Sequence, residues 1–120
     1  MTWNPSGYTL FINGDIFLQQ QNSGVPGNDI GRFFIGHNLD RNQTGGGWRS
    51  FLGYIGDIRW SDTVKYSSNF TPDPDLQVES DTLLLFKLDE EIGSTVYDVS
   101  GNAPDGTING AIWDVIECRE

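Results

Sequence analysis

The sequence predicts an all-β domain whose strands pair antiparallel, as in a sandwich or barrel. Short apolar and aromatic runs recur at roughly ten-residue spacing, and clusters of Gly, Asn and Asp separate them. Nowhere do apolar residues recur at helical spacing over three turns. We therefore expect about eight or nine short strands.

The first expected element is a tight β-hairpin near the N-terminus. Its strands are Tyr8–Ile12 and Asp15–Gln19, and the dipeptide Asn13-Gly14 lies between them. Asn-Gly readily adopts the positive φ angles of a two-residue turn, so these strands are expected to pair with each other.

The middle of the chain is expected to contain strands bordered by exposed glycine-rich loops. Strands are expected within Arg32–Gly36 and within Arg49–Ser61, and the loop between them includes the Gly-rich stretch Asn42–Gly47. The residues of the second segment that we expect in the core are Phe51, Ile55 and Ile58.

The C-terminal half begins with a connector and continues with strands. Two prolines remove backbone donors from Lys65–Asp75 and exclude a central strand there, and we expect a short helical turn at Asp62–Tyr66. Thr82–Leu88 shows the strongest pattern of a buried strand. Val96-Tyr97 and Thr107–Trp113 are expected to form two further short strands.

The composition indicates one domain, residues 1–120, and excludes some classes of binding partner. Seventeen acidic and seven basic side chains give a formal charge of −10, which repels phosphate backbones and anionic membrane surfaces. No apolar run approaches the roughly 18 residues of a membrane span. We therefore expect neither nucleic-acid binding nor membrane insertion. Cys118 is the only cysteine, so no intrachain disulfide can form.

Four stretches of the chain follow one another in the order of a family pattern. The first, Tyr8–Ile16, is similar to the strand–Asn-Gly–strand motif of that pattern, and the second, Phe33–His37, is similar to its "l-x-I-G" strand. The third, Phe51–Trp60, is similar to its "f-x-G-x-I-D-E-v-R-i" signature, and the fourth, Tyr66–Trp113, is similar to its C-terminal motifs. The chain thus resembles the concanavalin A-like, laminin G-like superfamily found in bacterial surface proteins. The resemblance implies a jelly-roll β-sandwich at an extracellular or cell-surface location, acting in the recognition of carbohydrate or of a protein partner.

The chain departs from that family pattern in two places. Gly56-Asp57 stands where the family has an acidic pair, so one carboxylate of a family-type calcium site is missing. Only Met1–Gly7 precede the hairpin, where the family has several strands, so the N-terminal half of the sandwich is expected to be absent. The alternatives are a cut fragment, a reduced sandwich, or two copies that complete each other. We expect a reduced sandwich that forms a homodimer.

Catalysis is not expected from the residues present. His37 follows a glycine at a strand end, and Cys118 has no neighbour in sequence that would activate it. Jelly-roll glycoside hydrolases use two acids on one strand, whereas the consecutive acids Asp89-Glu90-Glu91 alternate between faces and suit a solvated turn. The sequence therefore predicts a protein that is not an enzyme.

An oxygen-rich loop near the C-terminus is the candidate metal site. Calcium takes six to eight oxygen ligands, and backbone carbonyls can complete a shell begun by the side chains of Asp98, Asn102 and Asp105. Asx side chains that cap their own turns explain the same residues without an ion. Both interpretations stay open, with calcium as the candidate cofactor.

A second candidate site would bind carbohydrate. Sugar faces stack on aromatic rings, and the rings placed near loops are those of Trp48, Tyr54, Trp60 and Tyr66. Directional hydrogen bonds would come from neighbouring polar side chains. The predicted ligand-binding residues are Trp48, Arg49, Asn38, Asp40 and Asn42. The alternative is that Trp48 only covers a sheet edge.

The sequence therefore favours a non-catalytic recognition module with a glycan or protein ligand. Its competitor is a structural domain that self-associates through exposed sheet edges and has no ligand site. A remnant glycoside hydrolase comes third, since one scaffold of this kind hosts many functions.

Overall fold

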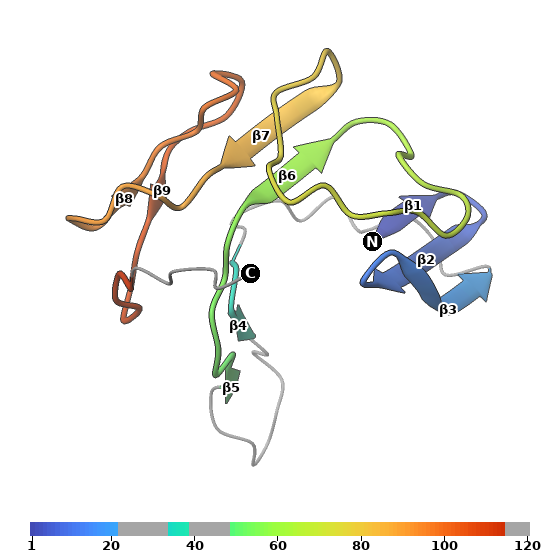
Figure 1. Ribbon diagram of the computed structural model, residues 1–120, viewed down its shortest axis with the longest axis horizontal. Helices are drawn as coiled ribbons and strands as arrows, with labels where there is room; N and C mark the ends of the chain where they lie inside the picture. The colour runs from blue at the N-terminus through green and yellow to red at the C-terminus, as the bar shows by residue number, and fades with distance from the viewer. Residues whose placement is uncertain (22–33, 39–48, 115–120) are drawn as a thin grey trace.

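The computed structural model describes residues 1–21, 34–38 and 49–114, and these form strands and loops without a helix (Figure 1). All strand pairs are antiparallel, in one three-stranded and three two-stranded sheets. The all-β prediction is therefore confirmed for this part of the chain. The strands are β1 Thr2–Asn4, β2 Gly7–Ile12, β3 Asp15–Gln21, β4 His37–Asn38, β5 Arg49–Ser50, β6 Ile58–Ser61, β7 Thr82–Phe86, β8 Thr95–Val96 and β9 Gly106–Thr107.

The predicted hairpin is the centre of the first sheet, whose order is β1-β2-β3. Asn13 and Gly14 both have positive φ, 53° and 86°, as a two-residue turn of this kind requires. A side chain at Gly14 would also place its Cβ 1.9 Å from the Phe70 carbonyl oxygen. The turn is therefore held by the backbone of a segment more than fifty residues away, because the Phe70 N–H donates to the Gly14 carbonyl.

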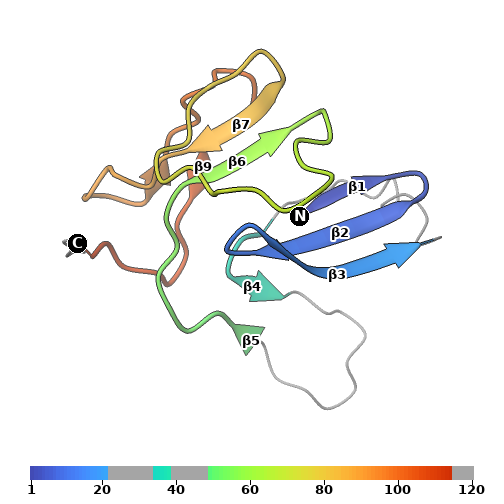
Figure 2. The ribbon, with the colours of Figure 1, turned by 45° about the vertical axis from the view of Figure 1, so that its right-hand side comes forward.

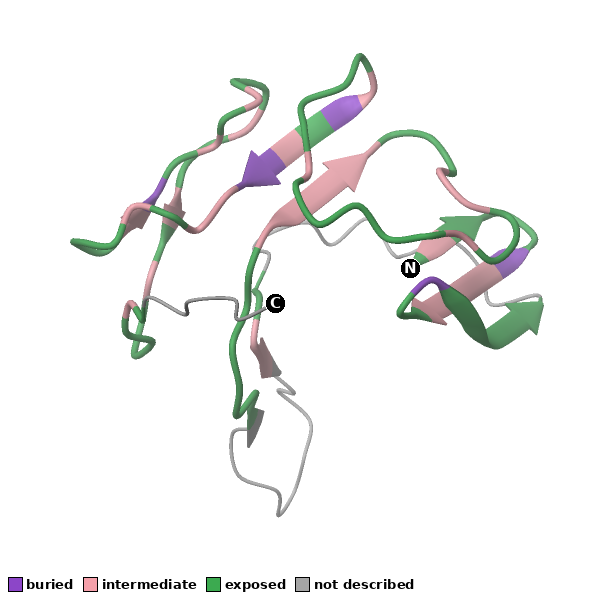
Figure 3. Ribbon diagram, viewed as in Figure 1, coloured by how far each residue is buried: buried purple, intermediate pink, exposed green. Residues whose placement is uncertain are grey.

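The small core of the described chain lies around β7. Leu85 is 2% exposed, and Phe86 and Val96 are the other buried apolar residues. β7 pairs with β6 and is joined to the next segment by a bridge between Phe86 and Asp98. Gly106 in β9 leaves room for the Phe86 ring, which would lie 3.2 Å from a Cβ at that position. The buried colour in Figure 3 is accordingly concentrated on β7 and β8, with short stretches in the first sheet.

The β6–β7 pair lies between the first sheet and the β8–β9 pair, as the two ribbon views show (Figures 1 and 2). Aromatic contacts join it to the first sheet: the rings of Trp3 and Trp60 meet edge to face with centroids 5.6 Å apart. Phe11 of β2 contacts the connector rings of Tyr66 and Phe70 in the same edge-on manner. The sheets are thus joined through their edges and rings, and a closed jelly-roll sandwich is not seen in the described residues.

Two core predictions in the middle segment are wrong. Phe51 is 59% exposed and Ile55 is 41% exposed, whereas Ile58 is half-buried in β6. The reason is that Arg49–Ser61 is not one strand: β5 ends at Ser50 and β6 begins at Ile58. Between them the chain folds back over the Phe51 ring, where a Cβ on Gly53 would lie 2.8 Å from that ring.

The C-terminal expectations are confirmed in part. β7 occupies most of the predicted buried strand, and the proline-containing connector forms no strand. The helical turn expected at Asp62–Tyr66 is absent, and the Asp62 N–H donates to the Asp81 carbonyl at the end of β6. The last predicted strand, Thr107–Trp113, is wrong except at Thr107, because β9 is Gly106–Thr107 and Ile108–Trp113 form no strand. In the described part of the chain, no helix is long and apolar enough to cross a membrane.

Candidate functional site

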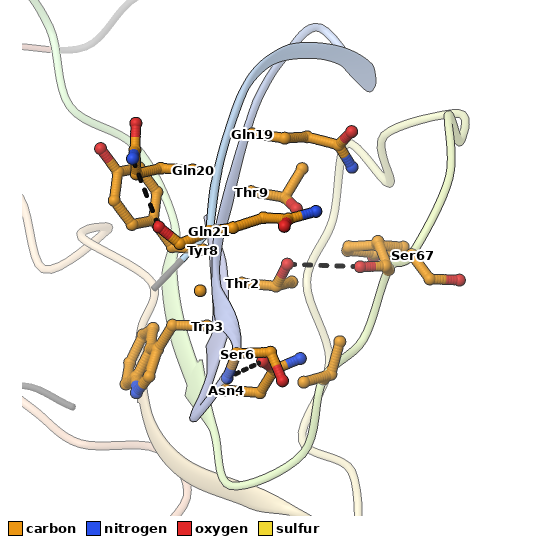
Figure 4. Close-up of a pocket in the computed structure, with 13 residues that line it drawn as sticks. Thr2, Trp3, Asn4, Ser6, Tyr8, Thr9, Gln19, Gln20, Gln21 and Ser67 are labelled. Atoms are coloured by element: carbon orange, nitrogen blue, oxygen red, sulfur yellow. Dashed lines mark hydrogen bonds between the residues drawn. The ribbon is translucent and has the colours of Figure 1, made fainter. Parts of the chain in front are cut away.

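A groove runs along the first sheet, where β1, β2 and β3 face the connector after β6 (Figure 4). Its cavity measures about 280 Å³. Its lining is rich in hydroxyl and carboxamide side chains. The lining residues are Thr2, Trp3, Asn4, Ser6, Gly7, Tyr8, Thr9, Gln19, Gln20, Gln21, Val64, Tyr66 and Ser67.

Strand alternation places Thr9, Gln19 and Gln21 on one face of the sheet, and Tyr8 and Gln20 on the other. Thr9 pairs with Gln19, and Gly7 pairs with Gln21, two residues further along each strand. Figure 4 shows Thr9, Gln19 and Gln21 projecting toward the segment that carries Ser67. Gly7 contributes no side chain, and a Cβ there would lie 2.0 Å from the Gln20 carbonyl oxygen. The glycine therefore allows the backbones of β2 and β3 to approach closely at this point.

The opposite wall of the groove is fixed by aromatic packing. The Tyr66 ring stacks on the Phe70 ring with centroids 3.5 Å apart and planes 4° apart, and Phe11 packs edge-on against both. The Thr2 hydroxyl donates to the Tyr66 carbonyl oxygen at 3.3 Å and ties β1 to this wall. Tyr66 is thus a groove residue, one of the four aromatics singled out from the sequence.

Several polar groups of the groove have no partner among the described residues. The side chains of Thr9, Gln19, Gln21 and Ser67 make no hydrogen bond there, whereas the Asn4 carboxamide oxygen accepts from the Ser6 N–H. None of the thirteen lining residues carries a charge, although one residue in five of the chain does. The groove therefore offers neutral donors and acceptors within an acidic protein.

The candidate metal loop is held together by hydrogen bonds to Asp98. One carboxylate oxygen accepts the Leu85 N–H at 2.8 Å, and the other accepts the N–H groups of Asn102 and Ala103 at 3.0 and 2.8 Å. The Ser100 N–H and hydroxyl donate to the same carboxylate. Partial burial by itself would raise the pKa of Asp98, but these donors lower it to about 2.

The other two predicted metal ligands take part in the same turn. The Asp105 carboxylate accepts the Asp98 N–H at 2.9 Å, and the Asn102 carboxamide donates to the Thr82 carbonyl at 2.8 Å. The three residues thus belong to one hydrogen-bonded turn, but their side chains bond different partners. The N–H groups aimed at Asp98 occupy the lone pairs that a cation would need. In the described residues no cluster of three or more His, Cys, Asp or Glu side chains has a metal-binding arrangement. Calcium binding stays a prediction.

Two ion-pair clusters engage most of the basic side chains near β6 and β7. The Lys65 ammonium lies 2.6 Å from Glu79 and 2.7 Å from Asp81, and Arg59 also pairs with Glu79. The Lys87 ammonium joins Asp57 to Asp75 of the connector. Asp57, the carboxylate of the Gly56-Asp57 pair, thus acts as an ion-pair partner.

The predicted carbohydrate residues fall mostly beyond the described ranges. Trp48, Asp40 and Asn42 lie outside them, and so does Cys118. Asn38 and Arg49 pair with each other in the β4–β5 ladder, but their side chains are not described. The other predicted aromatics are separated from one another: Tyr54 is exposed, and Trp60 packs against Trp3. His37 lies 3.4 Å from the Ser50 hydroxyl, between Nδ1 and Oγ.

Comparisons with protein-family models, curated proteins and solved structures find no match for this chain. Its function is therefore argued from the residues and their geometry.

Sequence reasoning missed the groove in the first sheet except for Tyr66. The signal was present: three consecutive glutamines, Gln19-Gln20-Gln21, follow an apolar run in one strand. In the hairpin register these glutamines pair with Gly7, Tyr8 and Thr9. A glycine and two hydroxyl-bearing residues of one strand therefore lie beside the carboxamides of the other. Pairing the strands residue by residue from the Asn-Gly turn would have found most of this arrangement.

Proposed function

We propose that this chain is a non-catalytic recognition module that binds a neutral carbohydrate in the groove of the first sheet. The observation that carries the proposal is the lining: none of its thirteen residues is charged, and all but Gly7 and Val64 have a hydroxyl, carboxamide or aromatic group. Because one residue in five of the chain is charged, thirteen residues chosen at random would include two or three charged ones. A neutral groove in a protein of charge −10 favours a neutral ligand.

The polar groups of the groove match the chemistry of sugar hydroxyls. A hydroxyl both donates and accepts, and so do the side chains of Thr9, Gln19 and Gln21, whose hydrogen-bonding capacity is unused within the described chain. Tyr66 adds ring surface, held in place by its stack on Phe70. At about 280 Å³ the groove is at the small end of ligand pockets, which suits a short or terminal sugar unit.

The resemblance of four motifs to the concanavalin A-like, laminin G-like superfamily supports the same function. We propose the jelly-roll sandwich as the complete fold, with the described sheets as parts of it, and an extracellular or cell-surface location. The non-catalytic character is supported by the acids around β6 and β7. Asp57, Glu79 and Asp81 are each paired with Lys or Arg, and such pairing suits structural acids better than a proton-transfer pair.

The experiment is a screen of neutral oligosaccharides, followed by calorimetric titration of the best ligand with a matched pair of variants. Thr9→Val with Tyr66→Phe removes the hydroxyls of two residues that line the groove and preserves side-chain shape and the Tyr66 ring stack. The control, Thr107→Val with Tyr97→Phe, makes the same chemical changes at exposed positions outside the groove.

We expect the groove variant to lose roughly tenfold or more in affinity, since each lost hydrogen bond to a ligand contributes about 1 kcal/mol. The control should bind like the wild type. Two results would contradict the proposal: no neutral glycan binds the wild-type chain, or the groove variant binds as tightly as the control.

A further inference from the structure

The chain contains the dipeptide Asn-Gly twice, as Asn13-Gly14 and as Asn109-Gly110. In this dipeptide the backbone nitrogen of the glycine can attack the side-chain carbonyl carbon of the asparagine, because glycine has no Cβ to hinder the approach. Asparagine is accordingly one of the chemically labile residues of proteins. The reaction requires the two atoms to come into contact, so the structure around each copy determines how fast it reacts.

The two glycines have nearly the same backbone conformation. The φ of Gly14 is 86° and the φ of Gly110 is 83°, both in the left-handed region that favours glycine. The glycines themselves therefore give no reason for the two copies to react differently. Any difference in rate comes from the asparagine before each glycine and from the contacts of each segment.

Asn13-Gly14 is fixed in a conformation that does not allow the reaction. Asn13 has a φ of 53°, and positive φ at both residues defines a type I′ turn between β2 and β3. In that turn the ψ of the first residue is about +30°, which places the Gly14 nitrogen nearly opposite the Asn13 Cβ across the Cα–C bond. Ring closure requires these two atoms to be eclipsed, so the turn must open before Asn13 can react.

Contacts with the connector after β6 keep this turn from opening. The Phe70 N–H donates to the Gly14 carbonyl at 3.0 Å, and the Ile16 N–H donates to the Asn69 carboxamide oxygen at 3.0 Å. The Asn69 carboxamide also donates to the Asp15 carboxylate at 2.9 Å. Opening the turn breaks these bonds together, so the open form is a small minority of the folded protein.

Asn109-Gly110 lies in a loop that is anchored only at its ends. The Ile108 N–H and the Trp113 indole N–H each donate to a carbonyl of the segment before β8, both at 2.8 Å. The four residues between these anchors, 109–112, are all exposed, and a Cβ on Gly110 would meet nothing within 4 Å. Asn109 does not have a positive φ, and its carboxamide makes no hydrogen bond among the described residues. Nothing in the described part of the chain holds this copy away from the reactive geometry.

We infer that Asn109 is a site of spontaneous deamidation in the folded protein, whereas Asn13, in the same dipeptide, is protected by the fold. The Gly110 nitrogen gives up its proton and bonds to the Asn109 Cγ, the Cγ–Nδ2 bond breaks, and the side-chain nitrogen leaves as ammonia. Water then opens the cyclic imide. Attack of water at Cγ gives aspartate, and attack at the former main-chain carbonyl gives isoaspartate, in which the chain runs through the side chain.

The modification adds one negative charge to a protein whose formal charge is already −10. The isoaspartate product also lengthens the backbone of the loop by one methylene group. The β8–β9 pair, which this loop follows, is separated from the first sheet by the β6–β7 pair (Figures 1 and 2). The modification is therefore remote from the groove, and the inference does not rest on glycan binding.

The test follows amide loss at both asparagines of the full chain, incubated at mildly alkaline pH with and without concentrated urea. Trypsin places Asn13 and Asn109 in different fragments, because Lys65 and Lys87 lie between them, and tandem mass spectrometry locates the converted residue. In the folded chain we expect Asn109 to convert roughly tenfold faster than Asn13 or more, since Asn13 reacts only from the opened minority. In urea the two rates should be similar.

Three results would overturn the inference. They are equal rates at the two asparagines in the folded chain, an Asn109 that converts in urea but not in the folded chain, and a difference between the two that persists unchanged in urea. Asn109→Gln supplies an independent check by isoelectric focusing, because glutamine would have to close a larger ring. The acidic form that the wild type accumulates should comigrate with Asn109→Asp and be missing from Asn109→Gln. An undiminished acidic form in Asn109→Gln would show that another residue is modified.

Discussion

The carboxylate of Asp98 accepts the backbone N–H of Leu85 at 2.8 Å and so joins the C-terminal loop to the most buried strand. Leu85 also receives, through its carbonyl, the N–H of Val99. Asp98 and Val99 therefore satisfy both the backbone N–H and the backbone carbonyl of Leu85, a core residue. Such bonds are needed because an unsatisfied backbone group in a buried strand is costly.

Replacing Asp98 by asparagine should destabilise the protein strongly. The change retains the shape, but the Nδ2 group can no longer accept the N–H groups of Asn102 and Ala103. We expect the free energy of unfolding to fall by about 2 kcal/mol. Urea denaturation would measure it, with Asp89→Asn, at an exposed residue, as the control for the lost charge. Equal stabilities of the two variants would contradict the central role of Asp98.

The same aspartate should make stability depend on pH in the acid range. Hydrogen bonding lowers the pKa of Asp98 to about 2 in the folded chain, from its usual 3.8. The contribution is therefore fully present above the unfolded pKa and is lost as the pH falls toward 2. Lys65 lowers the pKa of Glu79 and of Asp81, which adds to the trend in the same direction. Denaturation at several pH values between 2 and 6 should show a shallower loss for Asp98→Asn than for the wild type.

The glycine of the hairpin turn should not tolerate a side chain. Gly14→Ala must adopt a φ of 86° and place its Cβ 1.9 Å from the Phe70 carbonyl oxygen. We expect a loss of about 2 kcal/mol or more, from strain and from the separation of the hairpin from the connector. The control is Gly56→Ala, where a Cβ meets nothing within 4 Å. Thermal unfolding measures both, and similar melting temperatures would refute the explanation.

Features that depend on neighbouring residues could be predicted from the sequence, and those set by distant contacts could not. The Asn13-Gly14 turn fixes its own hairpin, and the apolar run that forms β7 has few alternatives to burial. The exposure of Phe51 depends on how the chain folds back at Gly53, which no local pattern encodes. The position of Asp62 likewise depends on a distant contact, because the carbonyl of Asp81, nineteen residues away, accepts its N–H.

The groove was harder to predict from the sequence than the strands were, for a physical reason. Aromatic residues near loops are the sequence signal for carbohydrate, and they include Tyr66 but also Trp60, which packs against Trp3. Whether a ring is free or packed depends on tertiary contacts that are invisible in the sequence. The carboxamides at Gln19 and Gln21 were overlooked because polar residues in a strand are usually interpreted as its solvent-facing side.

The connector after β6 should be released when Lys87 loses its charge. The Lys87 ammonium bonds Asp57, Asp75 and the Leu76 carbonyl, and Asp57 also accepts the Leu76 N–H at 3.2 Å. Hydrogen bonds to Asp57 and Asp75 raise the pKa of Lys87, so the clamp is fully present below the usual pKa of 10.5 and is lost at more alkaline pH.

In Lys87→Met the Asp57 carboxylate loses its cation and should hold the Leu76 amide less firmly. We expect faster hydrogen exchange at Leu76 with little change at Leu85 in the core. Lys65→Met is the matched control, because its partners Glu79 and Asp81 lie outside this contact. If both variants exchange alike at Leu76, the segment is held by something other than Lys87.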